Sequence, residues 1–379
     1  MTDKVFSVEM LADDWRDGLF LGRMQTADGP SPILLKSGVV YDMSTVAPTS
    51  AQLVAERAFD ASAGVAIGDI ESLDLSGDTR LLSPVDLQCV KAAGVTFAVS
   101  AIERVIEERA RGDATHAQAV RAALEEKIGG SIQKVSPGSP SAELLKQTLI
   151  SEGMWSQYLE VAIGPDAEIF TKSPVLSSVG WGDEVGIRSD STWNNPEPEM
   201  AILADPAGVA VGACLGNDVN LRDFEGRSAL LLGKAKDNNA SCSLGPLVRL
   251  FDDSFSMDDV RSAEIDLLIE GPDGYILEGH SSMSKISRDP EVLLAQAVSE
   301  HQYPDGFILM LGTLFAPTQD RDEPGRGFTH KVGDVVSIST PKVGKLVNPV
   351  THSALAKPWE FGLTALIQNL ADRGLIRPR

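Results

Sequence analysis

Two glutamates separated by one proline stand at the head of an apolar run, in the order Glu197, Pro198 and Glu199, followed by residues 200–203. The run predicts a β-strand, in which residues two apart face the same side, so both carboxylates are expected on one face. Like charges so close together repel, and both stay ionised only if a cation lies between them; otherwise one takes up a proton. Because Pro198 has no N–H to donate, the strand is expected to lie at a sheet edge or to begin there.

A third carboxylate follows the next apolar run, residues 209–215. Asp218 comes directly after Gly216 and Asn217 at the end of this run. Three oxygen donors with no histidine or cysteine beside them are the ligand set of a hard divalent cation, Mg²⁺ or alternatively Mn²⁺. We therefore predict a metal site made of Glu197, Glu199 and Asp218. The alternative is that these are ordinary charges on a solvated strand.

The overall charge restricts the partners of the protein. The 379 residues carry a formal net charge of −21 and are 43% apolar, which suits a globular enzyme and disfavours nucleic acids and anionic membranes. Three widely spaced cysteines form neither a disulfide framework nor a zinc motif. The first residues lack the apolar core of a signal peptide, and no apolar stretch is as long as a membrane span. These features predict a cytoplasmic protein that acts on a small molecule.

Four short motifs then occur in a fixed order along the chain. They are Glu-x-Glu at 197–199, Gly-Asn-Asp-Val-x-x-Arg-Asp at 216–223, Gly-Lys-x-x-Asp at 233–237 and Leu-Gly-Pro at 244–246. In this order and at these spacings they resemble the fumarylacetoacetate hydrolase family, over about residues 160–350.

The resemblance implies a mixed α+β fold that is mainly β, with a fumarylacetoacetate-hydrolase-like β-roll in the C-terminal domain. We expect a small β-rich N-terminal domain at residues 1–80 and a catalytic domain at 81–379, with a helical insertion at about 101–160. From the spacing of apolar residues, helices are expected at 51–56, 102–109, 116–128, 141–149, 290–300 and 359–373. Strands are expected at 20–24, 38–43, 158–165, 168–174, 248–251, 264–269, 275–279, 307–313 and 333–338.

The resemblance also assigns roles in the pocket. Family members hold Mg²⁺ or Mn²⁺ with the carboxylates that match Glu197, Glu199 and Asp218, and they place the lysine that matches Lys234 in the substrate pocket. Lys234 is the predicted catalytic base and Lys236 the second candidate, because burial and a nearby cation lower the pKa of a lysine.

Further site residues follow from the same comparison. Glu225 stands where the hydrolases of the family carry glutamine, and it is predicted to move a proton to a departing hydroxyl. The predicted substrate contacts are Thr313, Lys172, Asp237 and Phe97.

One motif departs from the hydrolases of the family. They carry Gly-x-Asn-Tyr-x-x-His, whose histidine activates water, where this chain has residues 94–100 with Ser100 at the histidine position. A hydroxyl without a partner base does not take a proton from water near neutral pH. Ser100 is therefore predicted as a catalytic residue of a reaction other than C–C hydrolysis.

The sequence is thus most similar to the sugar-acid dehydratases of this family. The resemblance implies that a metal-held 2-oxo acid, a 2-keto-3-deoxy-pentonate of the D-xylonate or D-arabinonate type, loses its C4 hydroxyl and yields 2,5-dioxopentanoate. Two alternatives remain: a C–C bond hydrolase of an acylpyruvate or 2,4-diketo sugar acid, and a non-catalytic metal-containing scaffold. The resemblance also implies a homodimer or homotetramer.

Overall fold

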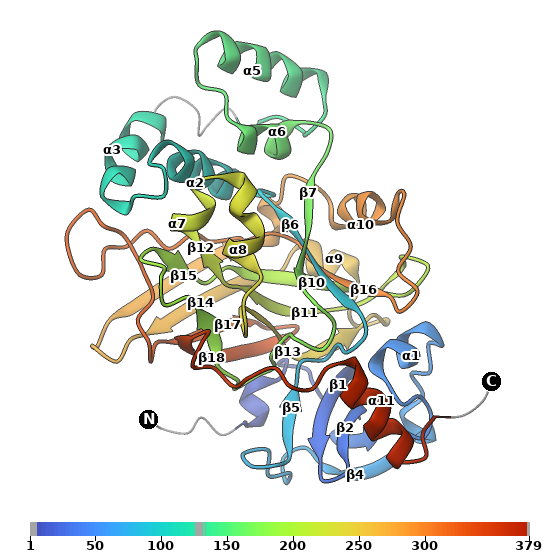
Figure 1. The fold of residues 1–379 in the computed structure, drawn as a ribbon. Helices are drawn as coiled ribbons and strands as arrows, with labels where there is room; N and C mark the ends of the chain where they lie inside the picture. Colours follow the sequence, from blue (N-terminus) through green and yellow to red (C-terminus); the bar gives the residue numbers. More distant parts are fainter. Residues whose placement is uncertain (1–5, 126–131, 133, 377–379) are drawn as a thin grey trace.

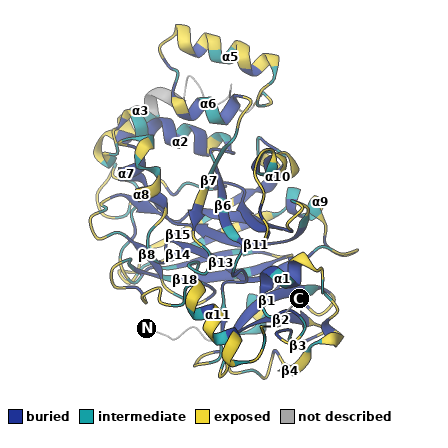
Figure 2. Ribbon diagram, turned by 45° about the vertical axis from the view of Figure 1, so that its right-hand side comes forward, coloured by how far each residue is buried: buried dark blue, intermediate teal, exposed yellow. Residues whose placement is uncertain are grey.

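The computed structural model describes residues 6–125, 132 and 134–376. Two open sheets lie at the centre, a group of helices covers one end, and the N-terminal strands with the C-terminal helix form the other end (Figure 1). Buried residues concentrate in the central strands (Figure 2). The predicted mixed, mainly β fold is therefore confirmed, and neither sheet closes into a barrel within the described residues.

The larger sheet has 11 strands in the order β4-β3-β2-β1-β13-β11-β10-β16-β6-β7, with β5 paired to β1. Neighbours are antiparallel except β16 and β6, which are parallel. The strands are β1 (Leu19–Thr26), β2 (Gly29–Lys36), β3 (Val39–Asp42), β4 (Val65–Asp69), β5 (Arg80–Leu82), β6 (Cys89–Gly94), β7 (Glu168–Ser173), β10 (Pro198–Ala204), β11 (Ala210–Asp218), β13 (Cys242–Leu250) and β16 (Phe307–Met310).

The second sheet has five strands in the order β15-β14-β17-β18-β8. Its strands are β8 (Val185–Ile187), β14 (Glu264–Glu270), β15 (Ile276–Ser282), β17 (Val335–Thr340) and β18 (Gly344–His352). The hairpin β14–β15 has the position that the sequence predicts. A short pair, β9 (Asn194–Asn195) and β12 (Asn220–Leu221), lies beside the ends of β10 and β11.

Several helices begin where a side chain caps the first turn. Thr49 accepts from the backbone N–H of Gln52 at the start of α1, and Asp289 caps α10 in the same way, which satisfies N–H groups that have no partner inside the helix. The α-helices are α1 (Ser50–Ala55), α2 (Ala98–Arg109), α3 (Ala114–Glu125), α5 (Pro140–Ser151), α6 (Gln157–Ile163), α7 (Arg222–Glu225), α8 (Leu232–Lys236), α9 (Met257–Arg261), α10 (Pro290–Val298) and α11 (Leu363–Asp372), and the 3₁₀ turns are η1 (Val8–Met10), η2 (Ala61–Ala63), η3 (Ala229–Leu231) and η4 (Met283–Lys285).

Helices α2, α3, α5 and α6 form a cap over one end of the sheets (Figure 1). The cap has a hydrophobic cluster of its own, separate from the main core. The chain enters it from β6 and returns through β7, and the two connections meet because Gly94 and Glu168 are cross-strand partners. The two chain connections of the cap therefore lie together, next to the carboxylates described below.

The N-terminal strands belong to the same sheet as the rest of the chain. Phe20 in β1 is the cross-strand partner of Arg249 in β13, and side chains of both parts share one hydrophobic core. Helix α11 packs on the N-terminal part, where Asn369 Nδ2 donates to the Asp28 carbonyl at 2.8 Å. The division at residue 80 stays a prediction. Among the described residues, no helix combines the length and the apolar character needed to cross a lipid bilayer.

Most predicted elements are present, with one clear correction. The strand predicted at 158–165 is instead helix α6, which Ser156 caps by accepting from the Tyr158 N–H. The end of the helix predicted at 116–128 lies outside the described residues. Of the two positions expected for Pro198, the start of a strand is confirmed, because β10 begins at this residue. The strand does not lie at a sheet edge, since β11 and β16 flank it.

Candidate active site

Three carboxylates meet where β10 begins and β11 ends. Glu197 and Glu199 flank Pro198, and the pairing of Pro198 with Asn217 brings Asp218 beside them. One oxygen from each of the three side chains lies within 4.8 Å of the others, and all three residues are buried. The backbone N–H of Asp218 donates to the Glu197 carbonyl at 3.0 Å, which fixes this register.

Two buried lysines neutralise part of this charge. Lys172 Nζ lies 2.6 Å from Asp218 Oδ1. Lys236 Nζ donates to Glu197 Oε2 and lies 3.1 Å from Asp218 Oδ2. Although burial lowers the pKa of Lys236, the carboxylates of Asp218 and Glu197 raise it above its usual range. In this arrangement Lys236 is a cation and not a base.

Glu199 has no such partner among the described residues. Its Oε2 accepts only the backbone N–H of Gly312, at 2.7 Å. Burial, with the charges of Asp218 and Glu197, raises its pKa well above the usual range. For Asp218 burial also acts to raise the pKa, but Lys172 and Lys236 bring it below its usual value.

This donor set fits a hard divalent cation. It offers three carboxylates and no nitrogen or sulfur ligand, which is the chemistry that Mg²⁺ and Mn²⁺ prefer. Glu199, which is buried and has no cationic partner among the described residues, is the group that such an ion would stabilise most, because a buried charge without a counter-charge is costly. The roles of Glu197, Glu199 and Asp218 as ligands stay a prediction that this geometry supports.

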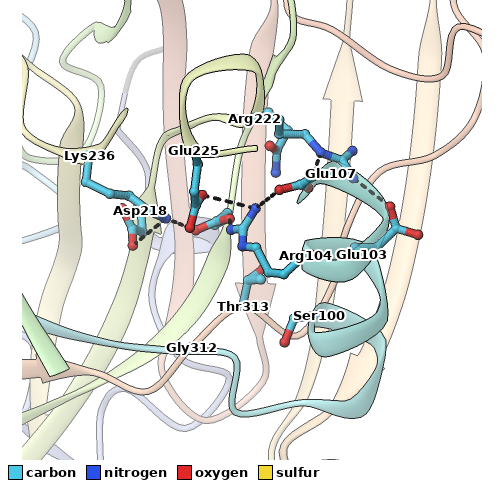
Figure 3. A network of polar contacts seen from close by, with 12 residues as sticks. Ser100, Glu103, Arg104, Glu107, Asp218, Arg222, Glu225, Lys236, Gly312 and Thr313 are labelled. Carbon is cyan, nitrogen blue, oxygen red and sulfur yellow. Dashed lines mark hydrogen bonds and ion pairs between the residues drawn. The ribbon is translucent and has the colours of Figure 1, made fainter. Parts of the chain in front are cut away.

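The carboxylates line a small cavity together with Ser100 and Arg104 of α2. Figure 3 shows Arg104 reaching from α2 toward Glu225 and Asp218. The volume of the cavity is about 10 Å³, room for a single water molecule. Two further acids, Glu168 of β7 and Glu225 of α7, line it together with Arg104 of α2 and Lys236. Acids thus outnumber cations around the cavity, and the imbalance favours an added cation.

The two further acids have altered proton affinities. Burial raises the pKa of Glu225 to about 7, against the opposing charge of Arg104, whose Nη1 lies 3.1 Å away. Burial also raises the pKa of Glu168. A carboxyl group with a pKa near neutrality can both give and take a proton at working pH.

Several predicted residues are at or beside this cavity. Ser100 and Thr313 line it. The Ser100 hydroxyl donates to the Phe97 carbonyl at 2.8 Å, and the Thr313 hydroxyl donates to the Phe315 carbonyl at 2.9 Å. Lys172 lies behind Asp218 and is fully buried.

Other predicted residues lie elsewhere, and the expected position of Lys234 is wrong. Its ammonium lies over the Phe224 ring, 4.4 Å from the centroid, and the side chain is 42% exposed. Lys236, two residues on, points to the opposite side of α8 and reaches the carboxylates. Asp237 is exposed and does not line the cavity, and Phe97 is packed in the main core instead.

Arg104 and Glu168 are site residues that the sequence analysis did not identify. Arg104 lies one helical turn after Ser100, so both face the same side of α2. Glu168 lies two and four residues before Phe170 and Lys172 in β7. Because side chains two apart in a strand point to the same face, the prediction of Lys172 as a pocket residue could also have indicated Glu168. The glycine at position 94 leaves room for this carboxylate, because a Cβ on Gly94 would lie 1.9 Å from Glu168 Oε2.

Two relatives of this chain are named as dehydratases. The chain is 32% identical over 183 residues to 2-dehydro-3-deoxy-D-arabinonate dehydratase of Saccharolobus solfataricus, covering 48% of this chain and 58% of that protein. It is 31% identical over 198 residues to a probable 2-keto-3-deoxyxylonate dehydratase of Haloferax volcanii, covering 52% and 65%. In each case the chain matches less than two thirds of the relative.

The fold has solved counterparts. A structure of 2-keto-3-deoxy-D-arabinonate dehydratase complexed with magnesium and 2,5-dioxopentanoate is similar, with a TM-score of 0.60 and 22% identity over 88% of this chain and 98% of that chain. Residues 163–351, which include the three carboxylates and Lys236, match the model of the fumarylacetoacetate (FAA) hydrolase C-terminal family. By this match residues 163–351 form a C-terminal domain of the fumarylacetoacetate hydrolase family.

Proposed function

We propose that the protein is a magnesium-dependent dehydratase that converts a 2-keto-3-deoxy-pentonate, of the D-xylonate or D-arabinonate type, into 2,5-dioxopentanoate. The observation that supports this proposal most is that one cavity contains both a cluster of three carboxylates and two further carboxyl groups with raised pKa values. Glu197, Glu199 and Asp218 form the proposed cation site, and beside them Glu168 and Glu225 have raised pKa values. The named dehydratases among the relatives support the substrate class.

The three clustered carboxylates would hold the ion. A bound Mg²⁺ supplies Lewis acidity toward the keto and carboxylate oxygens of a 2-oxo acid, which makes the hydrogens on C3 more acidic. Lys172 and Lys236 hold Asp218 and Glu197 in place from the protein side. Because the cavity has room for only about one water molecule, some of the side chains that line it must move aside when the substrate enters.

Elimination requires one group that takes a proton and another that gives one. Glu168, as a carboxylate, takes a proton from C3. Glu225, which is protonated in part near neutral pH, gives its proton to the C4 hydroxyl, which leaves as water. This step breaks the C3–H and C4–O bonds and forms a C3=C4 double bond.

A second proton shift then gives the aldehyde. The Glu225 carboxylate takes a proton from C5, and Glu168 returns its proton to C3, which moves the double bond to C4=C5. The resulting enol places a hydroxyl on C5. When Glu225 gives its proton to C4 and takes back the hydroxyl proton, C5 becomes the aldehyde and both acids regain their starting states.

The test is a product analysis with purified protein. Incubation with Mg²⁺ and each C4 epimer of 2-keto-3-deoxy-pentonate is expected to yield 2,5-dioxopentanoate, detected by mass spectrometry and by coupling to an aldehyde dehydrogenase. Pyruvate among the products of a diketo acid panel would favour a C–C hydrolase instead. No turnover of any 2-oxo acid would favour a non-catalytic scaffold.

We also expect the protein to act in the cytoplasm as a homodimer or homotetramer. Light scattering coupled to size exclusion measures the subunit number directly. A monomeric mass at micromolar concentration would contradict the expected assembly.

A further inference from the structure

A line of alternating charges runs from the carboxylate cluster into helix α2 (Figure 3). Arg104 donates to Glu197 Oε1 through Nη2, and to Glu107 Oε2 through Nη1 at 2.5 Å. Glu107 accepts from Arg222 Nε at 2.6 Å through its other oxygen, and Arg222 Nη2 donates to Glu103 Oε2, also at 2.6 Å. The line therefore connects a predicted metal ligand with three charged residues of the cap.

Burial makes these contacts specific. Glu107 and Arg222 are each 1% exposed, and both carboxylate oxygens of Glu107 are engaged, one by Arg104 and one by Arg222. Charges attract strongly where water is excluded. Glu107 is consequently held in one orientation, and it holds the guanidinium of Arg104 in turn.

The two oxygens of Glu197 have different neighbours. Lys236 bonds Oε2 and also contacts Asp218, so this oxygen lies on the side of Asp218. Arg104 bonds Oε1 from the side of α2. A cation bound through Oε2 would leave the bond to Arg104 in place, and partners of this kind fix the orientation of metal-ligating carboxylates.

We propose that Glu107 is a positioning residue of the metal site: it fixes Arg104, and Arg104 fixes the Glu197 carboxylate with Oε2 directed toward Lys236 and Asp218. The proposal rests on the proposed metal-dependent function. Glu107 does not line the cavity, so it acts on the site through Arg104. Arg222, which belongs to the Arg-Asp part of the 216–223 motif, completes the support from the opposite side.

The experiment measures the dissociation constant of Mg²⁺ alone by calorimetry, with the complete chain. Glu107→Gln keeps the size of the side chain and removes its charge, and it is expected to weaken Mg²⁺ binding by about 10-fold or more, as loss of such outer partners does. Glu108→Gln is the matched control, because Glu108 is the next residue of α2 and bonds Ser156 and Gln157 instead. Its Mg²⁺ affinity is expected to stay unchanged.

A second background separates positioning from a simple effect of charge. In Arg104→Met protein, Glu107→Gln is expected to change the Mg²⁺ affinity no further, because the connecting side chain is gone. Equal weakening with and without Arg104 would overturn the proposal, as would unchanged affinity in Glu107→Gln. Circular dichroism and the melting temperature report on folding, which a purely structural role would affect without moving the affinity.

Two further measurements keep the outcome decisive. If Arg104→Met does not fold, Arg222→Lys takes its place as the test. This variant retains the charge, but a lysine cannot reach Glu103 and Glu107 at once. It is expected to weaken Mg²⁺ binding, and unchanged affinity would overturn the proposal. If the unaltered protein binds no Mg²⁺ at all, the proposed function itself fails. Normal Mg²⁺ binding that is insensitive to Glu107 refutes only this inference.

Discussion

Replacement of Lys236 by methionine is expected to destabilise the metal-free protein more than the metal-bound protein. Lys236 is 3% exposed and pairs with both Glu197 and Asp218. Removing one partner of a buried ion pair costs about 3–5 kcal/mol, because the remaining charges are left uncompensated. Lys236→Met is therefore expected to lower the free energy of unfolding of the metal-free protein by about this amount.

Mg²⁺ should restore much of this loss. Lys236 competes with a cation for the same two carboxylates, so its removal is expected to strengthen binding, and each tenfold gain in affinity adds about 1.4 kcal/mol to the stabilisation by the ion. Urea titrations with and without Mg²⁺ measure both quantities.

Lys234→Met is the matched control for this prediction. Lys234 is half-exposed and contacts Phe224 and Asp190 at the surface, so its loss is expected to cost at most about 1 kcal/mol. Equal costs for the two lysines, or a smaller effect of Mg²⁺ on Lys236→Met than on the unaltered protein, would refute the reasoning.

Two other substitutions test the acids of the cavity. Glu225→Gln is expected to lower turnover by about 100- to 10,000-fold while Mg²⁺ affinity stays near that of the unaltered protein; a nearly active variant would exclude Glu225 as the acid. Because the pKa of Glu225 is about 7 and the acid must be protonated, turnover of the unaltered protein is expected to fall as pH rises through this value, and a rate that rises across that range would contradict the assignment. Gly94→Ala places a Cβ 1.9 Å from Glu168 Oε2 and must displace that carboxyl, so turnover is expected to fall by about 100-fold with Mg²⁺ binding retained. Steady-state rates and calorimetry check both variants, and unchanged turnover of Gly94→Ala would remove Glu168 from the mechanism.

The carboxylate cluster was predictable because it depends on local alternation. Glu197 and Glu199 share a side of the chain, and Asp218 ends the strand that pairs with theirs. Apolar runs with the period of a strand also predicted most of the sheets. The pairing of strands that are far apart in the sequence was not predictable in this way. For example, no local sequence pattern indicates that β1 pairs with β13 in one sheet.

The choice between Lys234 and Lys236 shows where motif position is insufficient. The two residues lie about 200° apart around a helix, since each residue turns it by about 100°. Only one of them can face the carboxylates, and the motif does not say which. The geometry of α8, set by the packing of Ala235 against Leu221 and Phe224, decides it.

The burial of the charges in α2 was not predicted, and α6 was predicted as a strand. Glu103, Arg104 and Glu107 are buried because their charges are neutralised in ion pairs with one another and with Arg222 and Glu197. The apolar run in α6 is short, and periodicity alone does not separate a short buried helix from a strand. The capping serine at 156 was the local signal for the helix.

The central claim is that Glu197, Glu199 and Asp218 together bind one divalent cation. Glu199→Gln tests it most directly, because Glu199 has no cationic partner among the described residues and its substitution leaves the lysine contacts intact. Calorimetric titration is expected to show one Mg²⁺ per chain in the unaltered protein and no saturable binding in Glu199→Gln. Undiminished binding in the variant, or none in the unaltered protein, would contradict the account.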